Sequence, residues 1–263
     1  MIPKVIHYCW FGGNPLTELA EKCIESWKKF CPDYEIVRWD ETNFDVNQND
    51  YCREAYESKK WAFVSDYARL KVLYEYGGIY MDTDVEVTKK LDAFLKHNAF
   101  SGFEDESHIP TGIMASEKNG EWMKLLLSYY DDRHFVLDDG NLDLTTNITS
   151  ITNMTLSKYP LMLNNQFQEV DGVYALYSSD FFCPKDYVSG ELRITDNTHT
   201  IHHFDGSWAS ESWKWRSKFI QKYYKFLGKT GARYLSIVFY CLMAGDFEYI
   251  INKVKKMFKR RLL

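Results

Sequence analysis

Two aspartates one residue apart, Asp82 and Asp84, follow a short apolar run in the stretch GGIYMDTD at positions 77–84. Side chains alternate along a strand, so both carboxylates are predicted to point the same way from a strand end. Two hard oxygen ligands on one side suit a divalent cation that carries substrate phosphates. The chain holds 20 aspartates, and an Asp-x-Asp is expected by chance about once or twice. The motif therefore needs support from its surroundings.

The segments before this motif predict the elements that would position it. Residues 61–76 have a strong helical pattern that the paired glycines at 77 and 78 would end. Asp66 and Arg69 lie three residues apart, on one face of that helix. Residues 4–8 and 34–39 predict strands on either side of a helix over 16–30. Strand, helix and strand at this spacing indicate a parallel βαβ unit and an α/β fold.

Later segments are less regular. Strands are predicted at 99–104, 113–116 and 174–177, a strand or loop at 181–184, and helices at 91–97 and 122–130. Residues 131–157 are rich in Asp, Asn and Thr and give no readable pattern, and 200–208 end the body. Beyond it, 213–227 has helical spacing of aromatic residues among lysines. The apolar run over 232–244 is shorter than the roughly 20 residues that a membrane span requires.

Charge is distributed unevenly along the chain. The net charge is −5, but the segment from Lys214 onward holds 13 Lys and Arg against Asp246 and Glu248. The remainder is therefore strongly acidic, which argues against a nucleic-acid-binding body and for a tail that meets an anionic surface. Six scattered cysteines without a Cys-x-x-Cys, and a start without a secretion-signal pattern, indicate reduced thiols and a cytoplasmic protein.

Four motifs in a fixed order resemble a known set: Trp10 after the first strand, Ser65-Asp66-x-x-Arg69, Gly77-Gly78-x-Tyr80-x-Asp82-x-Asp84, and 202–208 (HHFDGSW). The chain resembles the glycosyltransferase family of capsular-polysaccharide sugar transferases and yeast initiating mannosyltransferases, which is related to the catalytic domains of clostridial glucosylating toxins. The resemblance covers residues 3 to about 208. Order and spacing make it specific where a lone Asp-x-Asp is not.

The resemblance implies a GT-A, Rossmann-like nucleotide-sugar-binding fold, a nucleotide-sugar donor, Mn²⁺ or Mg²⁺, and retention of anomeric configuration. It implies that Asp84 binds the metal, that Asp82 reaches the metal or the ribose, and that His203 supplies a further ligand. The remaining implied roles concern the donor: Trp10 stacks on the base, Asp66 and Arg69 hold sugar hydroxyls, Tyr80 borders the site, and Ser207 and Trp208 close over the diphosphate.

One departure concerns donor identity. Where the toxins carry an asparagine that contacts the hexose, the local match here is Thr111, followed by Gly112. No carboxylate stands out as a nucleophile, which favours same-face substitution assisted by the leaving diphosphate. UDP-galactose or UDP-glucose is the first expectation for the donor and GDP-mannose the next, with a glycan or lipid-linked acceptor in surface or capsular polysaccharide synthesis.

Two other functions remain open from sequence. Asp82-x-Asp84 after an apolar strand also fits the nucleophile and acid of a haloacid-dehalogenase-type phosphatase, and the chain could be a non-catalytic sugar-nucleotide-binding protein. The expected organisation is a GT-A domain over 1–212 and a basic, aromatic-rich helical extension over 213–263. That extension would attach peripherally to the inner face of the cell membrane through anionic lipids, or pack on the acidic body.

Overall fold

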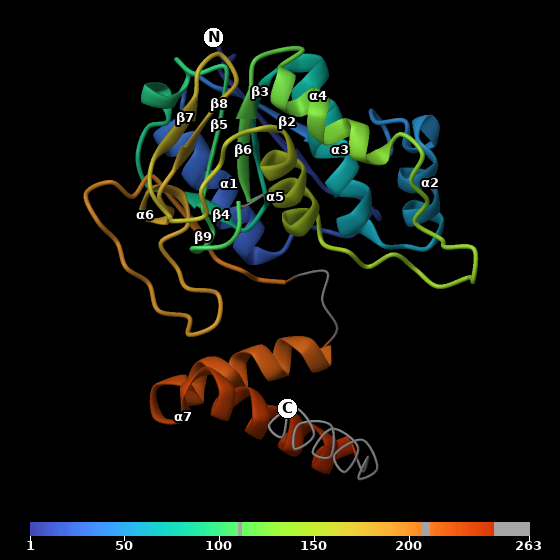
Figure 1. The fold of residues 1–263 in the computed structure, drawn as a ribbon, viewed down its shortest axis with the longest axis vertical. Coiled ribbons are helices and arrows are strands. Elements are labelled where there is room, and N and C mark those ends of the chain that lie inside the picture. The colour runs from blue at the N-terminus through green and yellow to red at the C-terminus, as the bar shows by residue number, and fades with distance from the viewer. Residues whose placement is uncertain (110–111, 207–210, 245–263) are drawn as a thin grey trace. The chain divides into compact units, whose positions relative to one another are not determined.

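The computed structural model describes residues 1–109, 112–206 and 211–244 (Figure 1). The chain divides into two compact units, one made of 1–185 and 193–205 and the other of 186–192 and the described residues from 206 onward. The expectations for Thr111, Ser207 and Trp208 lie outside the described residues.

A seven-stranded mixed sheet forms the centre of the first unit, in the order β2-β1-β3-β6-β5-β8-β7. Its strands are β1 (Val5–Cys9), β2 (Glu35–Trp39), β3 (Gly78–Met81), β5 (Ala99–Gly102), β6 (Ile113–Ser116), β7 (Gln168–Val170) and β8 (Tyr174–Tyr177). β1 pairs in parallel with β2 and β3, and β6 runs antiparallel to β3. A second, two-stranded sheet joins β4 (Val85–Val87) to β9 (Thr200–His202).

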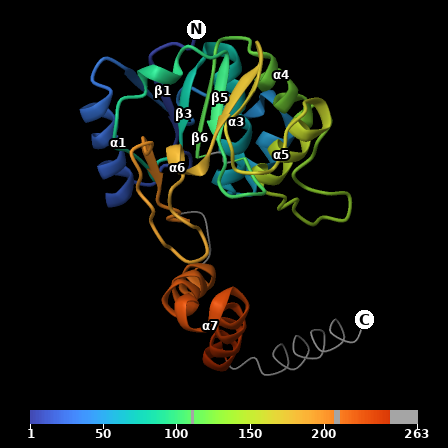
Figure 2. The ribbon, with the colours of Figure 1, turned by 60° about the vertical axis from the view of Figure 1, so that its left-hand side comes forward.

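Helices cover both faces of the large sheet. They are α1 (Glu18–Phe30), α2 (Asp50–Glu57), α3 (Trp61–Tyr76), α4 (Glu121–Leu127), α5 (Asn147–Lys158) and α6 (Ser179–Phe182), with 3₁₀ turns at Val46–Gln48, Asp92–Phe94 and Ser128–Tyr130. Figure 2 shows α1 on one side of β1 and β3, and α3, α4 and α5 on the other. Two buried apolar clusters follow this division, because Ile79 and Met81 of β3 pack with α1 while Tyr80 packs with α3.

Local sequence accounts for the ends of the elements that position the aspartates. The Thr17 hydroxyl accepts a hydrogen bond from the Ala20 N–H and caps α1. α3 ends at Gly77, and Gly78 follows with φ of +109°, where an added Cβ would lie 2.7 Å from the Val5 carbonyl oxygen. Only glycine accommodates both that backbone angle and that close approach. β3 therefore begins only two residues after the last residue of α3.

The predicted α/β class is confirmed, and the boundaries of α3 and β6 match the expected ranges. The segment 181–184, expected as strand or loop, instead begins within α6, and the predicted helix at 91–97 is a single 3₁₀ turn. Five cysteines (Cys9, Cys23, Cys31, Cys52 and Cys183) are buried and free, as predicted.

The second unit contains α7 (Glu211–Ala244), which breaks into two helices at Gly228, where φ is +64°. Aromatic side chains join the two helices, since the rings of Phe219 and Phe239 are 5.5 Å apart and those of Trp215 and Tyr240 are 6.2 Å apart. The described part of the segment expected as a helical extension, up to Ala244, is thus helical. Within the described part of the chain, no helix is both long and apolar enough to cross a membrane.

Candidate active site

Asp82 and Asp84 occupy the turn that carries the chain from the large sheet into the small one. The Asp82 N–H donates to the Gly112 carbonyl oxygen at 2.8 Å, and the Val85 N–H donates to the Asp82 carbonyl oxygen at 3.0 Å. Asp82 directly follows β3 and Asp84 directly precedes β4. The motif is thus fixed at both ends by strand pairing, with its carboxylates at the junction of the two sheets.

The Asp82 carboxylate is held by groups from α3 and β3. Arg69 Nη2 lies 3.2 Å from Asp82 Oδ1, and the Tyr80 hydroxyl donates to the same oxygen at 3.0 Å. The Arg69 guanidinium carbon lies 4.6 Å from the centre of the Tyr80 ring, within the range of a cation–π contact. Arg69 is 5% exposed. Because water screens this pair weakly, the guanidinium fixes the position of the Asp82 carboxylate.

The Asp84 carboxylate faces β9 and the residues after it. His202 Nε2 lies 3.3 Å from Asp84 Oδ1, and the Asp205 N–H donates to Oδ2 at 2.8 Å. Burial alone would raise the pKa of Asp84, but the His202 charge and these hydrogen bonds lower it to about 2. Burial would likewise lower the pKa of His202, yet the Asp84 charge raises it well above its usual value. The two groups therefore form a partly buried ion pair when no cation separates them.

Asp82, Asp84 and His202 each offer a ligand atom within 4.8 Å of the others. Ligands about 2.1 Å from a shared ion lie at most about 4.2 Å apart, so small side-chain movements would close this set around a cation. Two carboxylate oxygens and one imidazole nitrogen are a suitable donor set for Mn²⁺ or Mg²⁺. The donor chemistry and the geometry both fit a divalent metal.

The structure brings His202 to the aspartates and does not bring His203, the histidine selected from sequence. The His203 ring nitrogen Nε2 instead lies 2.9 Å from Glu86 Oε2, and only its backbone N–H reaches Asp84, at the carbonyl oxygen. His202 pairs with Val85 across the small sheet, and successive side chains of a strand point to opposite faces. The geometry thus favours His202 as the third ligand.

Asp66 and Arg69 form a second buried group beside the first. Arg69 Nη2 lies 3.2 Å from Asp66 Oδ1, so one guanidinium serves both Asp66 and Asp82. Asn147, at the start of α5, donates to Asp66 Oδ1 at 2.6 Å. Burial raises the pKa of the Asp66 carboxyl to about 7 although the Arg69 charge lowers it. This group can offer both donors and acceptors to the hydroxyls of a sugar.

Trp10 follows β1 at the edge of the sheet where β3 also ends, because the two strands are parallel. Its indole N–H donates to the Asn14 carbonyl oxygen at 2.7 Å, and the ring is partly buried. Gly12 leaves space that the Trp61 ring fills, since a Cβ there would lie 2.6 Å from that ring. The loop thus places an aromatic ring, in a fixed orientation, at the edge that carries Asp82.

A family model described as the glycosyltransferase sugar-binding region containing the DXD motif matches residues 17–101, which include Asp66, Arg69, Asp82 and Asp84. Residues 17–101 are therefore similar to the sugar-binding region of DXD-type glycosyltransferases. The resemblance predicted from the motifs is confirmed by this match and by the curated relatives.

Those relatives include yeast proteins. The chain is 34% identical over 125 residues to inositol phosphoceramide mannosyltransferase 3 of Schizosaccharomyces pombe, covering 44% of this chain and 34% of that protein. It is 28% identical over 146 residues to mannosyl phosphorylinositol ceramide synthase SUR1 of Saccharomyces cerevisiae, covering 52% and 37%. The chain thus spans about a third of these relatives. The solved structure of the PaToxG glycosyltransferase superposes with a TM-score of 0.47 at 20% identity, covering 60% of this chain and 69% of that one.

The sugar-binding region does not resemble the site of a haloacid-dehalogenase-type phosphatase in its contacts. That alternative needs Asp82 as a free nucleophile, whereas here Arg69 and Tyr80 both engage its Oδ1. The contacts of Asp82 therefore do not favour the phosphatase alternative.

Three residues outside the sugar-binding region complete the group and were not selected from sequence: His202, Asn147 and Gly112. An added Cβ at Gly112 would lie 2.9 Å from the His202 ring, so the missing side chain leaves room for that histidine. Asn147 lies in the segment whose pattern was unreadable. No spacing rule links it to Asp66, which is 81 residues earlier.

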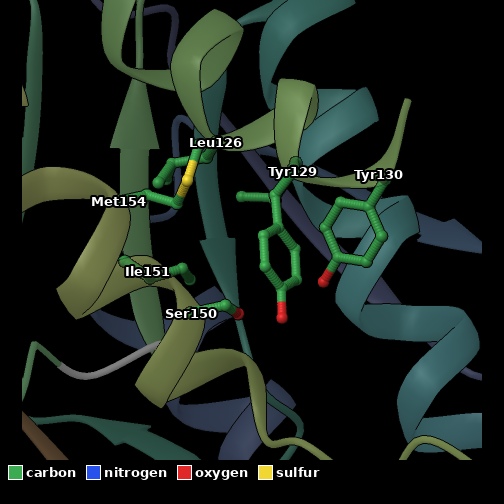
Figure 3. Close-up of a pocket in the computed structure, with 7 residues that line it drawn as sticks. Leu126, Tyr129, Tyr130, Ser150, Ile151 and Met154 are labelled. Atoms are coloured by element: carbon green, nitrogen blue, oxygen red, sulfur yellow. The ribbon is translucent and has the colours of Figure 1, made fainter. Parts of the chain in front are cut away.

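A narrow pocket between α4 and α5 is not part of this site (Figure 3). It is lined by Leu70, Leu126, Tyr129, Tyr130, Ser150, Ile151 and Met154. It has no room for a water-sized molecule, so its side chains pack against one another and leave no ligand site.

Proposed function

We propose that this protein is a divalent-metal-dependent, retaining glycosyltransferase that moves a hexose from a nucleotide sugar to a glycan or lipid-linked acceptor. The observation that carries the proposal is the group of Asp82, Asp84 and His202, whose ligand atoms lie within 4.8 Å of one another. The two aspartates belong to the segment that matches the DXD-type sugar-binding region. Such a group can hold a cation where a donor's diphosphate would lie.

Each residue has a distinct task in this proposal. Asp84 and His202 would hold the cation, and Asp82, fixed by Arg69, would face the cation or the ribose. A bound Mn²⁺ or Mg²⁺ would stabilise the negative charge that develops on the departing diphosphate. Asp66 would accept a hydrogen bond from a hydroxyl of the transferred sugar, and Arg69 would keep that carboxylate in place.

For the other contacts with the nucleotide-sugar donor, we propose the roles that the family resemblance implies. Trp10 would stack on the base, Tyr80 would border the nucleotide, and Thr111, Ser207 and Trp208 would contact the hexose or the diphosphate. Asp82 is engaged by Arg69 and Tyr80, so it is a poor nucleophile toward the sugar. We therefore favour same-face substitution in which the leaving diphosphate assists. Mass spectrometry that found a glycosylated carboxylate in the enzyme would contradict this mechanism.

UDP-galactose or UDP-glucose is the proposed donor, with GDP-mannose as the next choice, and surface or capsular polysaccharide synthesis is the proposed pathway class. A panel of nucleotide sugars, assayed with and without Mn²⁺ for donor hydrolysis and transfer, tests the activity. We expect one donor to be consumed only with metal. Metal-dependent phosphate release from an aryl phosphate would instead support the phosphatase, and donor binding without turnover would support a non-catalytic binding protein.

We also propose that residues 1–212 form the catalytic domain and that 213–263 attach it peripherally to an anionic membrane surface on the cytoplasmic side. The break at Gly228 supports this, because Phe226 is 85% exposed and Leu227 is 44% exposed next to it. Lys222 and Lys225 precede these two residues within the same short stretch of sequence. Apolar side chains flanked by lysines suit an anionic bilayer interface.

The full chain and its Phe226→Ser/Leu227→Ser variant can be compared by co-sedimentation with vesicles that contain anionic lipid. We expect the variant to lose binding, and a Leu156→Ser variant, altered at an exposed residue of the first unit, to keep it. Equal sedimentation of all three proteins would overturn the membrane proposal and leave the transferase proposal intact.

A further inference from the structure

The Asp66 carboxylate is contacted by two side chains, and both contacts are made to the same oxygen atom, Oδ1. Asn147 Nδ2 donates to Oδ1 at 2.6 Å, and Arg69 Nη2 lies 3.2 Å from the same atom. All three residues are more than nine-tenths buried. Neither of these two contacts uses the second oxygen, Oδ2. The two neighbours therefore fix the plane of the carboxylate and leave its second oxygen for another donor.

Asn147 is held in place by its own helix. On α5, the Thr155 hydroxyl accepts a hydrogen bond from the Trp122 indole N–H of α4 at 3.0 Å. One turn earlier, the Thr152 hydroxyl accepts from the Ile109 N–H at 3.2 Å. Both threonines are buried, so these bonds tie α5 to the elements beside it. The first residue of α5 is thereby presented to Asp66 in one position.

We propose that Asn147 is a positioning residue for donor recognition: together with Arg69 it fixes Asp66 through Oδ1, so that Oδ2 can accept a hydrogen bond from a hydroxyl of the transferred sugar. This inference rests on the proposed function and adds to it a residue outside the sugar-binding region. An amide in this place donates without adding charge. It therefore favours the ionised carboxylate and does not compete with Arg69.

The ionisation of Asp66 makes the role measurable. Burial raises the pKa of Asp66 to about 7, so its charge is set by the groups that surround it. Those groups come from six segments of the chain. They are Arg69 on α3, Asp82 after β3, Cys9 of β1, Tyr51 of α2, Tyr130 of the 3₁₀ turn after α4, and Asn147 of α5. Removing the amide takes away a donor to the charged form, so the pKa of Asp66 rises further.

The test compares wild type with Asn147→Ala and the isosteric Asn147→Asp. We expect the acidic limb of the kcat/KM profile for the donor to move about one pH unit higher in Asn147→Ala, because a hydrogen bond to the ionised form is lost. A larger shift is expected in Asn147→Asp, where a second carboxylate meets the first. A ¹³C-carboxyl NMR titration of Asp66 without donor should show the same order of shifts.

Asn49→Ala is the matched control, since Asn49 Nδ2 donates to the Tyr130 carbonyl oxygen at 2.8 Å and its side chain caps α2. It should lower the melting temperature without moving the Asp66 titration. An unchanged Asp66 titration in both Asn147 variants, or an equal shift in Asn49→Ala, would overturn the proposal. If Asn147→Ala does not fold, the isosteric variant decides. If wild type turns over no donor, the proposed function fails, while the NMR titration still tests whether Asn147 controls Asp66.

Discussion

Asp82 and Asp84 are two residues apart in the chain but belong to two different environments. Asp82 is held by Arg69 and Tyr80, both from the sixteen-residue stretch that ends in the motif. Asp84 is held by His202 and by the backbone of Asp205, which is 121 residues away. One carboxylate is thus positioned by its own neighbourhood in the sequence, and the other by a strand that only the folded chain brings near.

The partners also differ in how they carry charge. Arg69 remains protonated at any physiological pH, so the charge beside Asp82 is permanent. His202 can lose its proton, so the charge beside Asp84 depends on pH and on whether a cation is bound. The Asp82 side therefore supplies a fixed scaffold, whereas a proton and a metal compete on the Asp84 side.

The largest effect is expected at the cation side. Asp84→Asn removes a charged ligand and should lower kcat for sugar transfer by about a thousandfold, because the developing charge on the diphosphate loses its main support. Steady-state kinetics with saturating Mn²⁺ measure this. Asp171→Asn, at an exposed position of the same unit, should leave kcat unchanged. Turnover within about tenfold of wild type in Asp84→Asn would show that the aspartate is not needed for catalysis.

The group around Asp82 and Arg69 should contribute more to the stability of the folded protein than the group around Asp84. Arg69→Met leaves the buried Asp66 and the partly buried Asp82 without their shared cation, which should lower the free energy of unfolding by about 3 kcal/mol. Urea unfolding at neutral pH measures the loss. The comparison variant is Arg53→Met, whose ion pairs with Asp50 and Glu57 are exposed, and its urea midpoint should barely move. Equal losses in the two variants would remove the distinction between a buried scaffold and a surface pair.

The same division explains what the sequence could and could not predict. Local periodicity and the glycines Gly77 and Gly78 encode the helix over 61–76 and the strand that follows it. The elements that carry Asp66, Arg69 and Asp82 could therefore be predicted from the local sequence. The choice between two adjacent histidines depends on the register between β4 and β9, which no local pattern reports.

Asn147 is a second residue whose contact with the site could not be predicted from local sequence patterns. Its helix contains several threonines and asparagines, residue types that give no clear apolar stripe, so the segment had no readable period. The side chain matters only because α5 packs where it reaches Asp66 across 81 residues of sequence. Contacts of this kind become visible only with the tertiary structure.

The histidine pair tests the cation side directly. His202→Ala should weaken Mn²⁺ binding in the presence of a nucleoside diphosphate by about a hundredfold, because it removes one of three ligand side chains. His203→Ala removes a ring that contacts Glu86 and should change the affinity by less than about threefold. Isothermal titration calorimetry compares them. The reverse order of effects would show that the motif-based choice of His203 was right.

The smallest expected effect is the pH dependence of cation binding, which should arise on the Asp84 side of the site and not on the Asp82 side. Without a cation, the raised pKa of His202 stabilises the folded state below the unfolded-state value of 6.5, and that contribution is lost as pH rises through the folded-state pKa. A cation requires the unprotonated imidazole of His202. The affinity for Mn²⁺ should therefore increase with pH, by up to about tenfold per pH unit, as long as the pH is below the folded-state pKa of His202. The pKa of Asp84 is about 2, so Asp84 stays ionised throughout and adds no slope. Mn²⁺ titrations at pH 6 and 7 should therefore show the slope in wild type and lose it in His202→Ala. A slope that survived in that variant would place the competing proton on another group and detach His202 from the metal site.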